Sequence, residues 1–148
     1  MTQIMKTFPS NDCRASGQAS LLAREDLMEL AVTQESKFKI IKVAGRVDWE
    51  NARLLDKEVH QIVDDGFYHI VFDLNEVTFI CSGGVGALVY NLNKVKKSDG
   101  AIYIISSNEY VNYIFETLKF DIVFDGYLFD SYEKFKHQIL ERQGQTQP

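Results

Sequence analysis

The segment best suited to chemistry in this sequence is Cys81-Ser82-Gly83-Gly84, which joins a predicted strand to a predicted helix. Residues 77–80 are β-branched and aromatic, as in a strand, and residues 85–95 carry apolar side chains at helical spacing. A helix start has unpaired backbone N–H groups and the positive end of the helix dipole, so it attracts a phosphate or another anion. The pattern therefore predicts that Ser82 presents its hydroxyl at a helix start, either as the helix N-cap or as a phosphorylation site.

Other chemistries in the same segment agree less well with the sequence. A phosphatase that uses Cys81 as its nucleophile would need an arginine shortly after it to hold phosphate, yet no basic residue follows before Lys94. Another thiol enzyme or a redox sensor at Cys81 is left as an alternative, since a helix start lowers the pKa of a thiol. The glycine run at residues 83–86 has neither the G-x-G-x-x-G spacing nor the Gly-Lys-Ser/Thr of nucleotide-binding loops. The three histidines have no ligand spacing to one another or to a cysteine (His60, His69 and His137). We therefore expect no enzyme activity, no cofactor and no metal site.

The composition is that of a single folded domain. The chain has 148 residues, of which 45% are hydrophobic and 25% charged, and its formal net charge is -5. Because nucleic acids and anionic membranes attract basic surfaces, this charge argues against both as partners. No apolar run approaches the roughly 20 residues of a membrane span, and Cys13 and Cys81 do not make a disulfide framework. A reducing cytoplasm is the expected location.

Strands and helices alternate along the chain that surrounds the Ser82 segment. Apolar and β-branched runs predict strands at residues 30–32, 38–43, 69–74, 77–80, 101–105 and 122–124. Turns are expected between neighbouring strands at residues 35–37 and 75–76. This alternation predicts an α/β fold, with a sheet that is covered mainly by helices.

Capping residues mark where these helices begin and end. The first is expected to begin at Asp48 as its N-cap and to end at Gly66. The second follows Ser82. The last two begin at one of two adjacent polar residues, Ser107 or Asn108, and at a segment with capping-box spacing, Asp130-Ser131-Tyr132-Glu133.

The two ends of the chain lack this periodicity. Residues 1–26 are polar and broken by turn-forming residues, so we expect a flexible N-terminal extension, with room for a short helical turn within residues 20–30. Residues 27–142 form the predicted domain. Residues 143–148 are a predicted disordered tail.

Three segments together resemble a known family. They are Gly45-Arg46-Val47-Asp48, Val71-Phe72-Asp73-Leu74 and the stretch at residues 77–88, VTFICSGGVGAL. With these in place the chain resembles a STAS domain over residues 30–140, and more narrowly the bacterial anti-sigma factor antagonists. The most specific part is Asp73-Leu74 followed by residues 79–86, which are similar to the family's Phe-Ile-Asp-Ser-(Ser/Thr)-Gly-(Leu/Val)-Gly. Cys81 stands where that family has an acidic residue, and Gly83 where it has a hydroxyl residue.

The resemblance implies an α/β fold with a mixed β-sheet covered mainly on one side by about four helices. It also implies a partner-switching role. In that family the unphosphorylated protein binds an anti-sigma factor that is also a serine kinase, phosphorylation of the loop serine blocks the complex, and a serine phosphatase reverses the modification. By position the phosphorylated serine is Ser82. The expected partner surface combines the loop near residue 48 with the Ser82 segment, and its residues are Arg46, Asp48, Trp49, Cys81, Gly83, Gly84, Val85 and Tyr90.

The departures at Cys81 and Gly83 motivate an alternative function. Some STAS domains are scaffolds or signal-relay domains that bind partners without a phosphate switch. A homodimer is also left open by the resemblance. Neither alternative involves nucleic acid or a membrane.

Overall fold

The computed structural model describes residues 4–9 and 27–140, which form a six-stranded sheet in the order β1-β2-β3-β4-β5-β6. The strands are β1 (Ile4–Pro9), β2 (Leu27–Glu35), β3 (Phe38–Val47), β4 (His69–Ile80), β5 (Ala101–Ile105) and β6 (Leu128–Phe129). β2 is antiparallel to both of its neighbours, β1 and β3, whereas β3 to β6 are parallel to one another. The sheet is therefore mixed, as the family resemblance implies.

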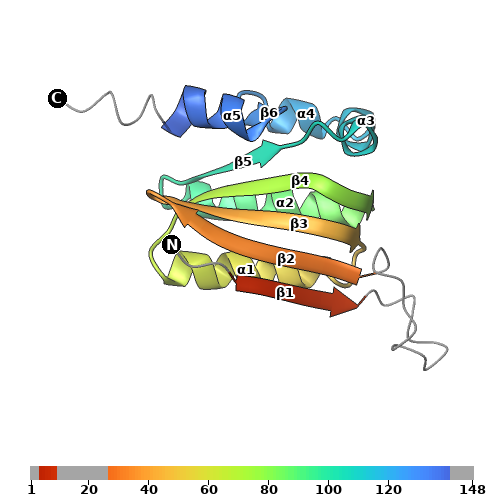
Figure 1. Ribbon diagram of the computed structural model, residues 1–148, viewed down its shortest axis with the longest axis horizontal. Helices are drawn as coiled ribbons and strands as arrows, with labels where there is room; N and C mark the ends of the chain where they lie inside the picture. Colours follow the sequence, from red (N-terminus) through yellow and green to blue (C-terminus); the bar gives the residue numbers. More distant parts are fainter. Residues whose placement is uncertain (1–3, 10–26, 141–148) are drawn as a thin grey trace.

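Helices connect the parallel strands. α1 (Ala52–Asp64) joins β3 to β4, and α2 (Ser82–Lys96) joins β4 to β5. Figure 1 shows both helices behind the same face of the sheet. The chain continues from β5 through α3 (Glu109–Thr117) and α4 (Phe120–Val123) to β6, and then into α5 (Tyr132–Phe135) and one π-helical turn, η4 (Lys136–Leu140). These later helices lie along the β5 side of the sheet (Figure 1).

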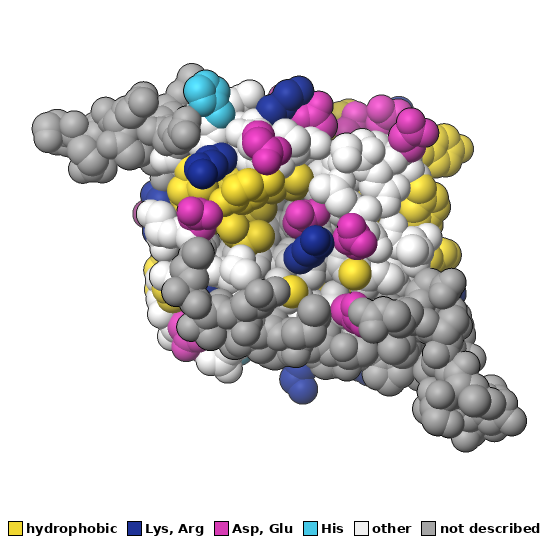
Figure 2. Space-filling model, in the orientation of Figure 1, with side chains coloured by type: hydrophobic (Ala, Val, Ile, Leu, Met, Phe, Trp, Pro, Cys, Tyr) yellow, Lys and Arg dark blue, Asp and Glu magenta, His cyan; other side chains and the backbone are white. Residues whose placement is uncertain are grey.

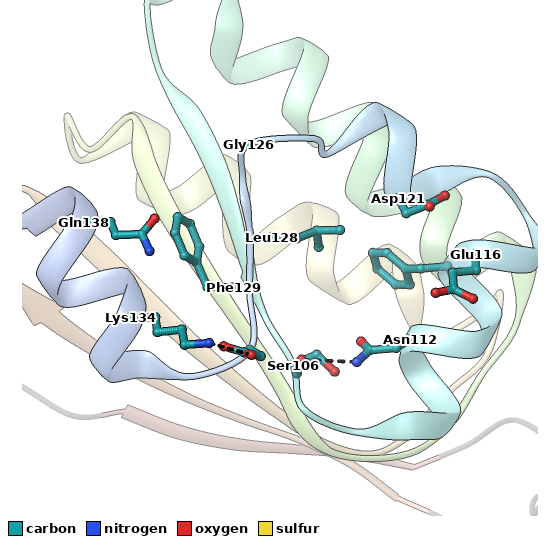
Figure 3. A pocket seen from close by; sticks show the side chains of 11 residues that line it. Ser106, Asn112, Glu116, Asp121, Gly126, Leu128, Phe129, Lys134 and Gln138 are labelled. Atoms are coloured by element: carbon teal, nitrogen blue, oxygen red, sulfur yellow. Dashed lines mark hydrogen bonds and ion pairs between the residues drawn. The ribbon is translucent and has the colours of Figure 1, made fainter.

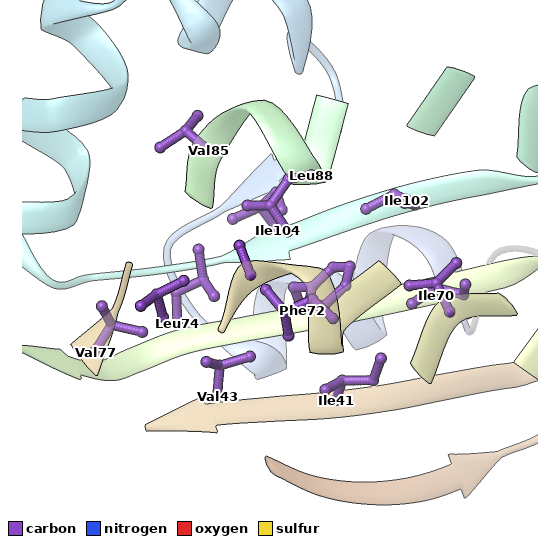
Figure 4. Close-up of a cluster of buried hydrophobic side chains, with 14 of the residues drawn as sticks. Ile41, Val43, Ile70, Phe72, Leu74, Val77, Val85, Leu88, Ile102 and Ile104 are labelled. Atoms are coloured by element: carbon purple, nitrogen blue, oxygen red, sulfur yellow. The ribbon is translucent and has the colours of Figure 1, made fainter. Parts of the chain in front are cut away.

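The main core fills the space between the sheet and the two helices α1 and α2. In Figure 4, Ile70, Phe72 and Leu74 of β4 lie in one buried cluster with Val85 and Leu88 of α2. Burying a side chain of this size contributes about 1.5–3 kcal/mol. Together these contacts hold the inner face of α2 against β4, so the start of α2 is fixed close to the end of β4.

A smaller cluster covers the opposite face of the sheet. The Phe38 and Phe135 rings meet edge-on with centroids 5.4 Å apart, and Phe135 also packs against Tyr103. Tyr132 of α5 donates a hydrogen bond of 2.5 Å to Glu35. Burial first, and then this hydrogen bond, raise the pKa of the Tyr132 phenol. Figure 2 views this face and shows hydrophobic side chains gathered below the C-terminal helices.

Several local predictions are confirmed. β2 and β3 form a hairpin whose turn contains Ser36, a residue with a positive φ of 56°. Gly66 ends α1 with a φ of 93°, a conformation that glycine adopts without strain. Asn108 is the N-cap of α3, and its side-chain oxygen accepts from the N–H groups of Tyr110 and Val111.

Three predicted features near the ends of the chain are wrong. Ile4–Pro9 pair with β2 as a strand, so this part of the predicted extension is not flexible. Residues 27–30 belong to β2 and not to a helical turn. The last helix is capped by Ser131, which accepts from the N–H of Lys134, and not by Asp130. The other residues of the predicted extension and the predicted tail lie outside the described residues.

Two further predictions about strands are also wrong. The turn expected at residues 75–76 is absent because β4 continues to Ile80, paired along its length with β3 through two register shifts. The strand expected at residues 122–124 is the end of α4 and its C-cap, and β6 takes its place in the sheet. Ile122 is 69% exposed and Phe124 is buried, so this short apolar run does not line a sheet face.

Candidate functional site

The candidate site is formed by loops at the carboxyl ends of β3, β4 and β5. Carboxyl ends of neighbouring parallel strands lie at the same edge of a sheet, which brings together residues that are far apart in the chain. The backbone N–H of Cys81, after β4, donates to the carbonyl of Val47 at the end of β3, at 3.2 Å. This bond holds the loop before α1 beside the first turn of α2.

The loop before α1 is built on a reciprocal pair of side chains. The carboxylate of Asp48 accepts from the N–H groups of Glu50 and Asn51 at 3.1 and 2.9 Å. In return the side-chain oxygen of Asn51 accepts from the N–H of Asp48 at 3.0 Å. Asp48 therefore caps the turn at residues 49–51 and not α1 itself, which begins at Ala52 with Asn51 in the N-cap position. The predicted N-cap of this helix is thereby corrected. Asn51 also donates to the carbonyl of Arg46 at 2.9 Å, so the turn is fixed to the end of β3.

The first turn of α2 presents Ser82 to solvent. Cys81, in an extended conformation, holds the N-cap position, and Ser82 is the first residue of the helix and is exposed. The N-cap interpretation of Ser82 is therefore wrong, and no side chain caps this helix. The N–H groups of Gly84 and Val85 donate to the carbonyl of Cys81 at 3.0 and 3.1 Å.

The amides of Ser82 and Gly83 have no protein hydrogen-bond acceptor among the described residues. There is also no acidic side chain in the first turn of α2. Unpaired N–H groups at a helix start are positively polarised, and the helix dipole adds to this. The surface around the Ser82 hydroxyl is therefore electrostatically suited to a negative group.

Two glycines allow α2 to begin so close to the strands. A Cβ added at Gly84 would lie 2.9 Å from a methyl carbon of Val47 and 3.0 Å from a side-chain carbon of Ile80. A Cβ added at Gly83 would lie 2.9 Å from the Cβ of Trp49. Trp49 therefore occupies the space that a larger residue at position 83 would need. This contact gives a physical reason for glycine at a position where the resembling family has a hydroxyl residue.

Two aromatic side chains are exposed near the candidate site. Trp49 is 66% exposed, although tryptophan is usually well covered, and it lies against Gly83 in the first turn of α2. Tyr90 is 61% exposed and lies two turns after Ser82 along α2. The structure thus brings Trp49, Cys81, Ser82 and Gly83 together, whereas Tyr90 is further along the helix. That these residues bind a partner stays a prediction.

The other predicted partner residues do not join this surface. Asp48, Gly84 and Val85 are buried and cannot touch a partner in this conformation. The Asp48 carboxylate caps its own loop, the Gly84 backbone packs closely against Val47 and Ile80, and the Val85 side chain lies in the core. The Arg46 guanidinium lies 4.0 Å from the ring centroid of Phe79. Because side chains alternate along a strand and Val47 faces α2, Arg46 belongs to the opposite face of the sheet. These four assignments are corrected.

Comparison with known proteins identifies the fold family. A family model described as the STAS domain matches residues 29–135, which is more than half of the chain. The chain belongs to the STAS domain family. The predicted resemblance is thereby confirmed.

Proteins similar to this STAS domain include anti-sigma factor antagonists. The anti-sigma-B factor antagonist of Staphylococcus aureus (strain NCTC 8325 / PS 47) is 26% identical over 89 residues, which are 60% of this chain and 82% of that protein. The crystal structure of an anti-sigma factor antagonist from Mycobacterium paratuberculosis has a TM-score of 0.66 at 20% identity and covers 77% of this chain and 94% of its own. The Bacillus cell fate determinant SpoIIAA in its phosphorylated form has a TM-score of 0.59 at 13% identity, with 77% and 98% covered. These two structures share the fold.

Sequence reasoning missed one contact at the site of this STAS domain. The hydroxyl of Tyr110, in the first turn of α3, bonds to the backbone of Ile80 immediately before Cys81. The two residues are 30 positions apart, and a tyrosine in a helix has no local signature for such a contact. Only the packing of α3 against β4 brings them together.

A pocket of about 460 Å³ lies elsewhere on the STAS domain, between α3, β6 and the C-terminal helices (Figure 3). Its side chains include Glu116 and Asp121, and its lysine, Lys134, is paired with Asp130 at 2.9 Å. This charge distribution does not suit an anionic ligand, and none of the predicted site residues line it. Among the described residues, no helix is long and apolar enough to span a membrane, and no group of three His, Cys, Asp or Glu side chains could hold a metal ion.

Proposed function

We propose that this STAS domain is an anti-sigma factor antagonist that acts by partner switching. In the unphosphorylated state it binds an anti-sigma factor that is also a serine kinase. Phosphorylation at Ser82 releases that partner, and a serine phosphatase restores binding. The observation that carries the proposal is an exposed serine hydroxyl at the first position of α2, beside the exposed side chain of Trp49.

The electrostatics of the first turn support a phosphate at Ser82. A phosphoserine carries about -1.5 to -2 charges at neutral pH. The helix dipole stabilises a negative group at this position by roughly 0.3–1 kcal/mol, and the free amides of Ser82 and Gly83 can donate to it. The isolated domain therefore tolerates the modification without unfolding.

The same charge acts differently in a complex. Trp49 and Tyr90 are the kind of large aromatic residues that anchor protein interfaces. Trp49 lies against the first turn of α2 at Gly83, and Tyr90 is exposed two turns after Ser82. A partner that covers them would also cover Ser82 and exclude water from it. An unpaired charge buried in this way costs about 3–5 kcal/mol. Phosphorylation thus opposes the complex while it spares the fold, which is what a switch requires.

The similar proteins support this function to different degrees. The Staphylococcus aureus relative is named as an anti-sigma-B factor antagonist, and one structure with the same fold is of a phosphorylated protein. Cys81 favours the alternative, a STAS scaffold or signal-relay domain without phosphorylation, because no carboxylate precedes the serine for a kinase to recognise.

Phosphorylation can be tested directly. The protein is incubated with ATP and the serine kinase encoded nearest to its own gene, and the modified residue is located by mass spectrometry. Phosphate on Ser82 supports the switch, whereas modification at another residue or at none supports the scaffold function.

Binding is tested with charge variants at the two ends of one helix. Ser82→Asp should weaken the affinity for that kinase roughly 30-fold or more, equivalent to about 2 kcal/mol or more, while the melting temperature stays within a few degrees. The control, Ser98→Asp, adds the same charge at an exposed position beyond the other end of α2. Equal affinities for the two variants would contradict a switch at Ser82.

A further inference from the structure

We propose that Tyr110 is a positioning residue for the Ser82 site, because its hydroxyl takes the place of a neighbouring strand at the end of β4. The hydroxyl accepts a hydrogen bond from the N–H of Ile80 at 3.2 Å and donates one to the carbonyl of the same residue at 3.3 Å. In a parallel sheet the N–H and C=O of one residue point to the same neighbouring strand. Tyr110 therefore satisfies both groups that an adjacent strand would otherwise pair.

The Tyr110 hydroxyl can take the place of a strand because β5 is much shorter than β4. β5 pairs with His69–Asp73, the first five residues of β4, and ends at Ile105. The remaining residues of β4 keep β3 on one side, but none of the described strands pairs with them on the other. Backbone groups left unpaired along this edge would weaken the end of β4.

Side chains from the segment after β5 cover that edge. Asn108 donates from its side-chain nitrogen to the carbonyls of Asn75 and Val77, at 3.3 and 2.8 Å. The same amide group caps α3 through its oxygen. Tyr110 continues this series at Ile80, so the start of α3 acts as a continuation of β5 made of side chains.

The contact at Ile80 determines where Ser82 points. Cys81 is bonded on one side to Val47 of β3, and the residue before it is bonded on the other side to Tyr110. The last peptide of β4 is thereby held from both edges immediately before α2 begins. Without the hydroxyl, only the β3 side fixes the direction in which the chain enters the helix. The predicted consequence for phosphorylation of Ser82 rests on the proposed function, whereas the structural effect does not.

The first experiment measures amide hydrogen exchange by NMR in Tyr110→Phe, which removes the hydroxyl and keeps the ring. Tyr113→Phe is the matched control, since Tyr113 lies one turn further along α3 and is 64% exposed. We expect exchange at Ile80 to become about five-fold faster in Tyr110→Phe, the factor set by the loss of one typical hydrogen bond. Exchange at the core amide of Ile104, which bonds to the carbonyl of Tyr127, should change less. Unchanged exchange at Ile80 would overturn the proposal whatever the protein's function is.

The second experiment measures the rate of Ser82 phosphorylation by the kinase described above. A slower rate in Tyr110→Phe than in Tyr113→Phe, at substrate concentrations where both variants are folded, supports positioning. An equal rate, despite faster exchange at Ile80, would overturn it and leave a purely structural contact. If the wild-type protein is not phosphorylated at all, the proposed switch fails. The hydrogen-exchange data then show independently whether the Tyr110 hydroxyl holds the backbone at Ile80.

Discussion

Gly84 and Gly86, two glycines in the first half of α2, should respond in opposite ways to the same substitution. An alanine Cβ at Gly84 would meet side chains of Val47 and Ile80 at 2.9 and 3.0 Å, closer than carbon atoms normally approach. At Gly86 an added Cβ meets no atom within 4 Å. The two positions are two residues apart in one helix, so the pair isolates the effect of packing against the strands.

The expected magnitudes follow from two general effects. Replacing glycine by alanine inside a helix stabilises the protein by roughly 0.5–1 kcal/mol, because alanine loses less backbone entropy on folding. Gly86→Ala should therefore raise the free energy of unfolding by about that amount. Forcing an extra methyl group into a well-packed interface costs about 1–3 kcal/mol. Gly84→Ala should consequently be less stable than Gly86→Ala by about 1–3 kcal/mol.

Urea unfolding followed by circular dichroism measures this difference, and thermal unfolding provides a second readout. For a chain of this size each kcal/mol corresponds to a shift in melting temperature of roughly 2–4 °C. Because Gly84 sets how closely α2 approaches β3 and β4, its alanine variant should also displace Ser82 and reduce its phosphorylation. Equal stability of the two variants would refute the close contact between the start of α2 and the end of β3.

Two further predictions concern other parts of the molecule. Trp49→Ala should weaken binding of the anti-sigma factor kinase by about 2 kcal/mol or more, as for an interface hot spot, with little change in the melting temperature. The control is Ile122→Ala, at a similarly exposed position on α4, which should bind normally. Titration calorimetry measures the affinity of both variants. Since folding raises the pKa of Tyr132, the phenol contributes stability below its unfolded pKa near 10, and that stability is lost as the pH rises above this value. The melting temperature should therefore fall more steeply above pH 10 in the wild type than in Tyr132→Phe, and parallel curves would contradict this.

Much of the fold follows from local sequence patterns. The hairpin of β2 and β3, the end of α1 at Gly66 and the start of α3 at Asn108 depend on residues close together in the chain, where capping and turn preferences act. The junction at Cys81–Ser82 is of the same kind, because a β-branched strand meets glycines and a helical stripe within a few residues. For these elements the sequence is sufficient.

Other features depend on contacts between distant residues. The pairing of Ile4–Pro9 in the sheet depends on β2, whose partner residues follow 18 to 28 positions later in the chain. The continuity of β4 depends on its pairing with β3. A local turn signal at residues 75–76 is overridden because strand pairing there satisfies the backbone. The predicted last strand at residues 122–124 is wrong for the same reason, because β6 forms that strand instead. A short apolar run does not by itself show whether it will pair with the edge of a sheet.

The candidate site at Ser82 also combines features set by the local sequence with features set by tertiary packing. The sequence by itself determined that a serine hydroxyl lies at a helix start, because strand, glycines and helix follow one another directly. Only the tertiary structure decided which neighbours share its surface: Asp48 turns inward to cap its loop, Trp49 turns outward, and Tyr110 reaches Ile80 from another helix. Side-chain direction depends on how the loops after β3, β4 and β5 pack against one another, and that packing involves residues that no local pattern connects.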